Sequence, residues 1–72
     1  MNYEELVLKK FGERVRKLRQ MLNISQEELA FRCSLHPNYI SDIERGRRNL
    51  SLISIAKLAS GLDVGIDALF IE

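Results

Sequence analysis

Several residue types that carry enzyme and metal chemistry are scarce in this chain of 72 residues. It contains one cysteine, one histidine, one proline and no tryptophan. A single cysteine excludes an internal disulfide and a cysteine-rich zinc site. Neither it nor the histidine has an acid–base or metal-binding companion at a workable spacing, and the sequence has no phosphate-cradling glycine loop. We therefore expect no enzyme activity, no metal site and no cofactor, and we interpret Cys33 as a small core residue, with a reactive thiol as the alternative.

Long apolar runs are also missing. No stretch approaches the roughly 18 apolar residues that a membrane-spanning helix needs, and the start MNYEELVLKK opens with acids instead of a secretion signal. We expect a cytoplasmic protein with no membrane partner. At 46% hydrophobic and 29% charged residues the composition is globular, and residues 1–72 make one domain near the lower size limit for unaided folding. Short capped helices and few alternating β-branched runs indicate an all-α fold.

The stretch from about residue 25 to 45 carries start and stop signals for two short helices. Ser25 and Glu28 form an S-x-x-E capping box at the start of the first helix. The second begins with His36 as its N-cap and Pro37 at its first position, and Gly46 follows its end, where a left-handed residue is needed. Two capped helices separated by about three residues are the sequence form of a helix-turn-helix.

Helices are predicted on both sides of this motif. An apolar stripe indicates a helix over about 2–22. Gly12 interrupts this stripe, so we expect the turns before it to fray or to form a separate extension. A second helix is predicted over about 52–60, ended by Gly61. Its residues are almost all apolar, so we expect neighbouring elements to wrap it. A last short helix is predicted at about 66–70.

Charge is distributed unevenly, although the net charge is only +1. Residues 1–50 hold ten of the eleven Lys and Arg against seven acids, whereas residues 51–72 hold one Lys against three acids. Most of the cations in the first helix are interpreted as a solvated face, and a minority as phosphate contacts. The asymmetry suits a chain with one end facing DNA and the other facing a protein partner.

The segments SQEELA, YISDIERGRRN and SLISIAKLASGLDVGIDALF closely resemble the lambda-repressor/Cro-type (XRE-like) family over roughly residues 11–70. Within that family, the length and the RRNLSL segment look most like restriction–modification controller proteins. The resemblance implies a compact five-helix DNA-binding domain that acts as a dimeric, sequence-specific transcriptional regulator of restriction–modification genes, including its own. The alternatives are a phage-type repressor, an antitoxin, or a protein-interaction module that keeps the fold without binding DNA. Ser34 departs from the family, which usually has glycine in that turn.

The second motif helix is the one expected to enter the major groove of double-stranded DNA. Asn38 is the best base reader by position, because its amide can bond adenine N6 and N7 together. Asp42 would accept from cytosine N4 or repel wrong sites, and Arg48 would reach a phosphate, a guanine or a narrow minor groove. His36 has pure N-capping as its alternative. The expected DNA contacts are Gln26, His36, Asn38, Tyr39, Ser41, Asp42, Arg45, Arg47, Arg48 and Asn49.

The resemblance assigns further roles outside that helix. Gln26 matches a family glutamine that bonds the DNA backbone. Arg19 and Glu44 match an ion pair that ties the first helix to the recognition helix, so we interpret them as structural. Glu27 and Glu28 stand where related controllers and repressors touch the polymerase sigma subunit, and solvated helix caps are the alternative interpretation.

The C-terminal segment predicts association. Three large apolar residues, Leu69, Phe70 and Ile71, follow one another there. A domain this small cannot bury all three on one short helix, and an exposed apolar patch marks an association surface. We therefore expect a homodimer, the alternative being that these side chains close the base of the core. Two copies about 34 Å apart on DNA would require a near-palindromic operator. The expected interface residues are Ile66, Leu69, Phe70 and Ile71.

Overall fold

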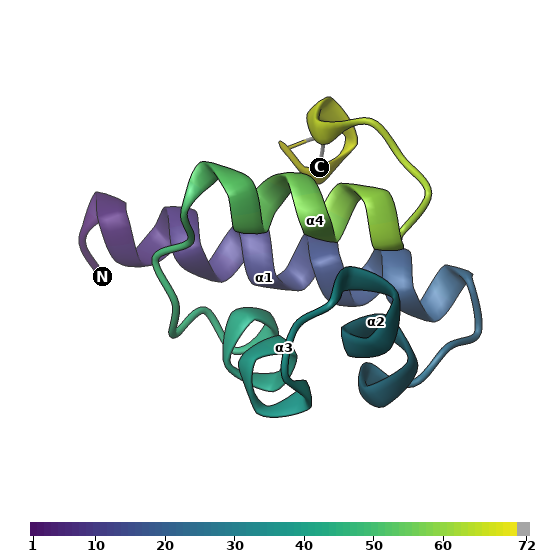
Figure 1. Cartoon of the computed structure of the whole chain (residues 1–72). Coiled ribbons are helices and arrows are strands. Elements are labelled where there is room, and N and C mark those ends of the chain that lie inside the picture. The colour runs from purple at the N-terminus through teal and green to yellow at the C-terminus, as the bar shows by residue number, and fades with distance from the viewer. Residues whose placement is uncertain (71–72) are drawn as a thin grey trace.

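The computed structural model describes residues 1–70, in which four α-helices are followed by a short 3-10 helix (Figure 1). The elements in chain order are α1 (Tyr3–Met21), α2 (Gln26–Cys33), α3 (Pro37–Glu44), α4 (Leu52–Gly61) and the 3-10 helix η1 (Ile66–Phe70). The all-α prediction is confirmed, and the five-helix count is corrected to four α-helices plus η1. The last segment is too short to complete an α-helix, and it closes with the tighter hydrogen bond from Ala68 N–H to the Gly65 carbonyl, at 3.1 Å.

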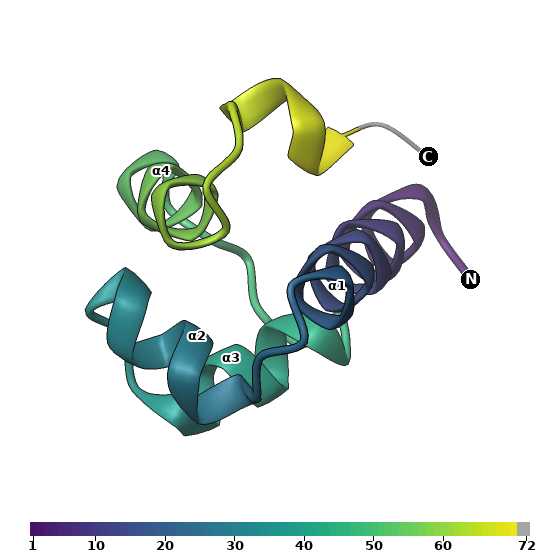
Figure 2. The ribbon, with the colours of Figure 1, turned by 90° about the vertical axis from the view of Figure 1, so that its right-hand side faces the viewer.

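The helices enclose one core to which every element contributes. α3 packs against α1 and α2, α2 also packs against α4, and η1 lies between α1 and α4 on the side away from α2 and α3 (Figure 2). Because all five elements share this core, the orientation of α3 is fixed by the whole domain. The largest fully buried side chains are Val15, Leu29, Ile40, Ile43, Leu58, Leu62 and Leu69.

All four α-helices begin at a side-chain cap, which satisfies a backbone N–H that has no partner within the helix. The predicted caps Ser25 and His36 accept from the N–H groups of Glu28 and Asn38 at 3.0 and 3.1 Å. The Glu28 carboxylate accepts from Arg32 Nε one turn further on, at 3.0 Å. Of the two hydrogen bonds of the predicted capping box, the one that Ser25 accepts is formed. The Glu28 side chain instead joins an exposed ion pair with Arg32.

Two glycines have roles that differ from those predicted. Gly12 does not interrupt α1, which is continuous from residue 3 to residue 21. A Cβ atom at Gly12 would overlap the carbonyl oxygen of Ile43 and lie 2.9 Å from that of Glu44, so glycine lets α1 approach the end of α3. Gly61 is likewise not a stop signal, since it is itself the last residue of α4. A Cβ atom there would overlap the sulfur of Cys33, so glycine lets α4 approach the end of α2.

The prediction that neighbours wrap α4 holds only for its second half. Leu58, Ala59 and Gly61 are buried, whereas Leu52 and Ile53 in the first turn are 71% and 66% exposed. Among residues 1–70, no helix is both long and apolar enough to cross a membrane.

Candidate nucleic-acid interface

A left-handed turn joins α2 to α3 and sets the angle between them. Ser34 has φ 57° and ψ 41°, the conformation that a glycine would adopt without steric cost. The N–H of Leu35 donates to the carbonyl of Ala30 at 2.9 Å and closes the end of α2. The serine is therefore accommodated without a change of fold.

α3 presents two distinct faces. Ile40 and Ile43 are almost fully buried in the core and hold the helix against its neighbours. His36 and Asn38 at the start of the helix are exposed, and Tyr39, Ser41 and Asp42 are half-buried. The predicted DNA-reading edge is therefore accessible from solvent at its N-terminal end, the end that reaches base edges first in a helix-turn-helix. The described fold thus leaves His36 and Asn38 open to solvent and the three candidate residues that follow them partly exposed.

A partly buried polar network fixes the two ends of the motif. The guanidinium of Arg19 donates from Nε to Oε2 of Glu44 at 2.7 Å, from Nη2 to Oε1 at 3.0 Å, and from Nη1 to the carbonyl of Ile24 at 2.8 Å. Gln26, the first residue of α2, donates from Nε2 to Oε1 of Glu44 at 3.0 Å. The hydrogen bond to Glu44 raises the pKa of Arg19 further, against the opposing effect of burial. One carboxylate therefore joins α1, the start of α2 and the end of α3.

Three of the candidate DNA contacts, Tyr39, Asp42 and Arg48, form a cluster that the sequence did not predict. Arg48 lies in the loop after α3 and turns back toward the helix, placing Nε 3.5 Å from Oδ2 of Asp42. Its guanidinium carbon lies 4.9 Å from the centroid of the Tyr39 ring. Asp42 and Tyr39 are one helical turn apart, a spacing that the sequence does show, but the path of the loop that brings Arg48 to them has no periodic signal.

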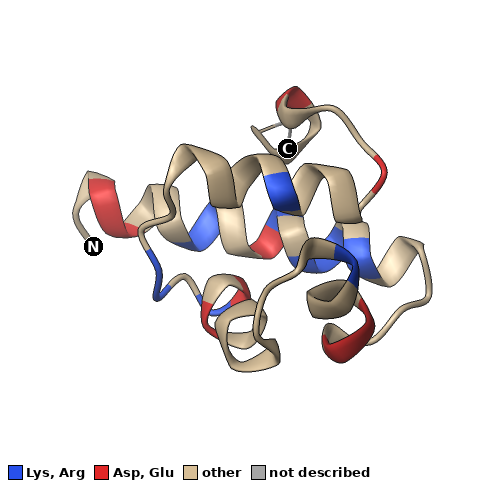
Figure 3. Ribbon diagram, in the orientation of Figure 1, with Lys and Arg blue, Asp and Glu red and all other residues tan. Residues whose placement is uncertain are grey.

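The remaining cations of the loop face solvent. Gly46 takes the left-handed conformation predicted for it, with φ 74°, and the N–H of Arg47 donates to the carbonyl of Asp42 at 2.9 Å. Arg45, Arg47 and Asn49 are exposed. Figure 3 shows Lys and Arg on α1 and on this loop, and acids at the start of α2 and in the segment after α4.

At the C-terminal end, one predicted interface residue proves to belong to the core. Leu69 is only 1% exposed, because η1 folds over the gap between α1 and α4 and inserts this side chain. Phe70 and Ile66 are 59% and 43% exposed, as an association surface requires. Ile71 lies outside the described residues.

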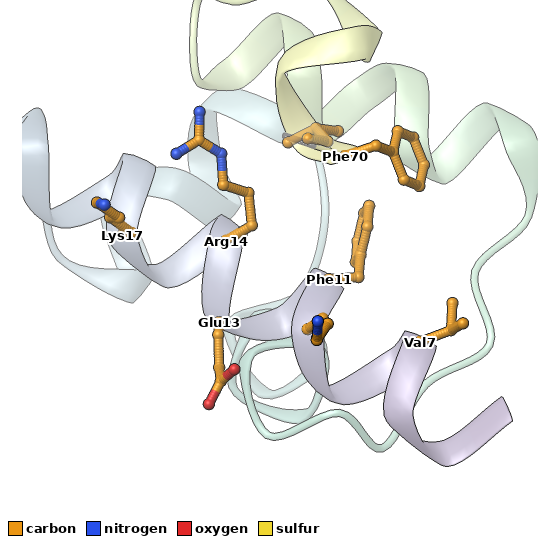
Figure 4. A pocket seen from close by; sticks show the side chains of 8 residues that line it. Val7, Phe11, Glu13, Arg14, Lys17 and Phe70 are labelled. Atoms are coloured by element: carbon orange, nitrogen blue, oxygen red, sulfur yellow. The ribbon is translucent and has the colours of Figure 1, made fainter. Parts of the chain in front are cut away.

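A groove of about 390 Å³ lies between α1 and η1 (Figure 4). The rings of Phe11 and Phe70 face one another in it, with centroids 5.4 Å apart and planes at 44°. Arg14 donates from Nε to the carbonyl of Ala68 at 2.8 Å and joins α1 to η1. Sequence reasoning missed the contribution of α1 to this surface, although Phe11 belongs to its apolar stripe. The groove is lined by Val7, Lys10, Phe11, Glu13, Arg14, Lys17, Leu69 and Phe70.

Cys33 is a core residue, as predicted. It is 3% exposed, and burial raises the pKa of its thiol to about 11, partly opposed by a hydrogen bond with the backbone of Gly61. A neutral, buried thiol is a poor nucleophile. Within residues 1–70, no three His, Cys, Asp or Glu side chains gather as metal ligands.

Comparison with known proteins yields one family. Residues 15–69 match the model of the helix-turn-helix family. Control protein C.BamHI of Bacillus amyloliquefaciens is 56% identical over 55 residues, which cover 75% of this chain and 68% of the relative. Control protein C.MunI of Mycoplasma sp is 39% identical over 62 residues, covering 85% and 84%. The crystal structure of the restriction-modification controller protein C.AhdI from Aeromonas hydrophila superposes with a TM-score of 0.89 at 48% identity, over 90% of this chain and 98% of that one.

Proposed function

This chain belongs to the helix-turn-helix family, and on that premise we propose that it is a restriction–modification controller, a dimeric DNA-binding regulator of restriction and modification genes, including its own. It is a transcription regulator and not an enzyme. We place its action in the cytoplasm, with double-stranded DNA as its partner. The observation that carries the proposal is the accessible N-terminal edge of α3, held by a core to which every element contributes.

In the proposed complex, α3 lies in the major groove. Asn38 reads an adenine through its amide, and Ser41 and Asp42 follow one turn later. Gln26 and the N-terminus of α2 bond the DNA backbone, where the helix dipole favours phosphate. The proposal gains support from the hydrogen bond between Gln26 and Glu44, which holds the glutamine at the end of α3. Phosphate contacts that fix the register come from Tyr39, Arg45, Arg47 and Asn49.

We propose dimerisation through the C-terminal end, around Phe70 and Ile66. Both side chains are exposed, and Phe70 forms one wall of the apolar groove against α1. η1 and α3 lie on different sides of α1 (Figure 2). A contact through η1 therefore leaves α3 accessible, so that two copies can read the two halves of a near-palindromic operator.

Contact with the polymerase sigma subunit is a further part of the proposal. Glu27 and Glu28 are exposed in the first turn of α2, the helix that crosses the DNA backbone in this motif. Glu28 already pairs with Arg32, so Glu27 is the better candidate of the two.

Selection of bound duplexes from a random pool tests the proposed function, since it reports the site, its symmetry and its spacing together. Asn38→Ala should relax discrimination at one base position, whereas Arg48→Ala should weaken binding by about 1–3 kcal/mol. Gln20→Ala on α1 and Lys57→Ala on α4 remove the same kinds of group from exposed residues outside the proposed contacts and should change neither quantity. A wild-type protein that shows no salt-sensitive binding to any duplex would instead be a protein-interaction module.

A further inference from the structure

One acidic side chain on the proposed DNA-reading surface is in direct contact with one of its cations. Asp42 belongs to α3, and the Nε atom of Arg48 lies 3.5 Å from its Oδ2 atom. The guanidinium is also stacked near the Tyr39 ring, 4.9 Å from its centroid. The side chains of Arg48 and Asp42 keep 50% and 33% of their surface exposed. The cluster therefore lies at the protein surface, where a duplex can reach it.

Holding Arg48 in this way restricts what it can bind. A free arginine would contact any phosphate, and a phosphate contact carries no sequence information. If Arg48 left the cluster for a phosphate, the carboxylate of Asp42 would lose its counter-charge beside a polyanion, which is unfavourable. Arg48 is also unlike a lysine here, because its planar group can stack on the ring and still donate from its outer edge.

Resting on the proposed function, we propose that Asp42 determines specificity by holding Arg48 against Tyr39 and so penalising sequence-independent binding. A G·C pair facing the cluster relieves the penalty. In the major groove guanine offers the O6 and N7 acceptors to Arg48, and cytosine offers its N4 amine to Asp42. The cluster thus supplies a second base-reading position beside Asn38.

Asp42→Asn tests this inference, since it preserves shape and removes the charge. Dissociation constants are measured for the selected operator and for a scrambled duplex of the same length, over a series of salt concentrations. We expect the variant to bind the scrambled duplex about fivefold more tightly, the size of effect that an exposed charge pair produces. The salt slope on that duplex should steepen by about 0.9, because Arg48 becomes a phosphate ligand. The operator should gain no affinity, so the ratio between the two duplexes falls.

A double-mutant cycle separates this role from a general charge effect. In an Arg48→Ala background, Asp42→Asn should no longer change the preference for operator over scrambled duplex, because the asparagine carbonyl still accepts from the cytosine N4 amine and the lost charge acts through Arg48. Asp63→Asn removes the same charge from an exposed residue with φ 58°, a conformation that asparagine tolerates, and should leave the preference unchanged. Arg48→Lys, in a loop where folding is not at risk, keeps the charge without the planar group and should also lower the preference.

Three results would overturn the inference: equal changes on both duplexes in Asp42→Asn, the same effect from Asp63→Asn, or an effect that persists without Arg48. Failure of the proposed function looks different, because the wild-type protein would then show no salt-sensitive binding to either duplex.

Discussion

Replacing Glu44 by glutamine should destabilise the domain far more than the removal of an exposed charge from its helices. The Glu44 carboxylate receives three hydrogen bonds, two from Arg19 and one from Gln26. Its side chain keeps only 4% of its surface exposed, and that of Arg19 keeps 13%. Glutamine preserves the shape but leaves the guanidinium without its counter-charge in a site that water hardly reaches.

The size of the loss follows from that burial. Removing one partner of a buried ion pair costs about 3–5 kcal/mol. Arg19 would keep its bond to the Ile24 carbonyl, and glutamine still offers one acceptor, so we expect about 2–3 kcal/mol. For a domain of this size each kcal/mol lowers the melting temperature by about 4–8 °C. The melting temperature should therefore fall by about 8–24 °C.

Urea unfolding followed by circular dichroism at one fixed protomer concentration measures this loss. Glu28→Gln is the matched control, because it removes the exposed partner of Arg32 and should cost less than about 0.5 kcal/mol. If Glu44→Gln cost as little as the control, the network would not anchor the motif, and our reasoning would be refuted.

A paired replacement separates stability from DNA binding. Arg19→Met with Glu44→Leu substitutes apolar side chains of similar size, which commonly restores stability. DNA affinity should stay about fivefold lower, because Gln26 has lost the acceptor that positions it.

Three other predictions concern the core and the C-terminal surface. Gly12→Ala should lower the free energy of unfolding in urea by about 1–3 kcal/mol, because the added Cβ overlaps backbone carbonyls of α3. Gly65→Ala is the control and should be tolerated, because its Cβ meets only the flexible side chain of Asp67, 2.5 Å away. Burial raises the pKa of Cys33 from 9.0 to about 11, so its stabilising effect is complete below pH 9 and is lost between pH 9 and 11. The wild type should lose about 1–3 kcal/mol more than Cys33→Ala across that window in unfolding titrations. Phe70→Glu should give monomers in sedimentation, whereas Phe31→Glu, at an 82% exposed aromatic on α2, should remain dimeric; a dimeric Phe70→Glu would place the interface elsewhere.

The features predicted correctly from the sequence are those set by residues close together in the chain. The caps at Ser25 and His36 and the left-handed Gly46 depend on neighbours within a few positions, so local chemistry decides them. Gly12 and Gly61 were misinterpreted for the opposite reason. Each is small because a distant segment of backbone or side chain approaches it, and a single sequence does not show which segment that is.

The same distinction between local and distant determinants applies to the candidate site. The outward-facing residues of α3 follow from helical periodicity, and they are the ones named from the sequence as candidate DNA contacts. The pairing of Arg48 with Asp42 depends on the path of a loop, and the burial of Leu69 beside an exposed Phe70 depends on the rotation of a single 3-10 turn. Periodicity fixes neither of these.

The positions of the Lys and Arg side chains make Asp42 more important for the proposed DNA binding than the sequence indicated. α1 carries six of them, but Arg19 is committed to Glu44, and Arg14 bonds η1 and lines the groove there with Lys10 and Lys17. Much of the positive charge on α1 therefore faces the C-terminal end of the domain and not the motif. In the proposed complex, the three arginines of the loop after α3 therefore contribute much of the attraction to phosphate, together with Lys9, which lies against Gly46 of the same loop. Since one of those three is paired with Asp42, that single carboxylate should lower the affinity for sequence-independent DNA by about the fivefold factor expected from Asp42→Asn.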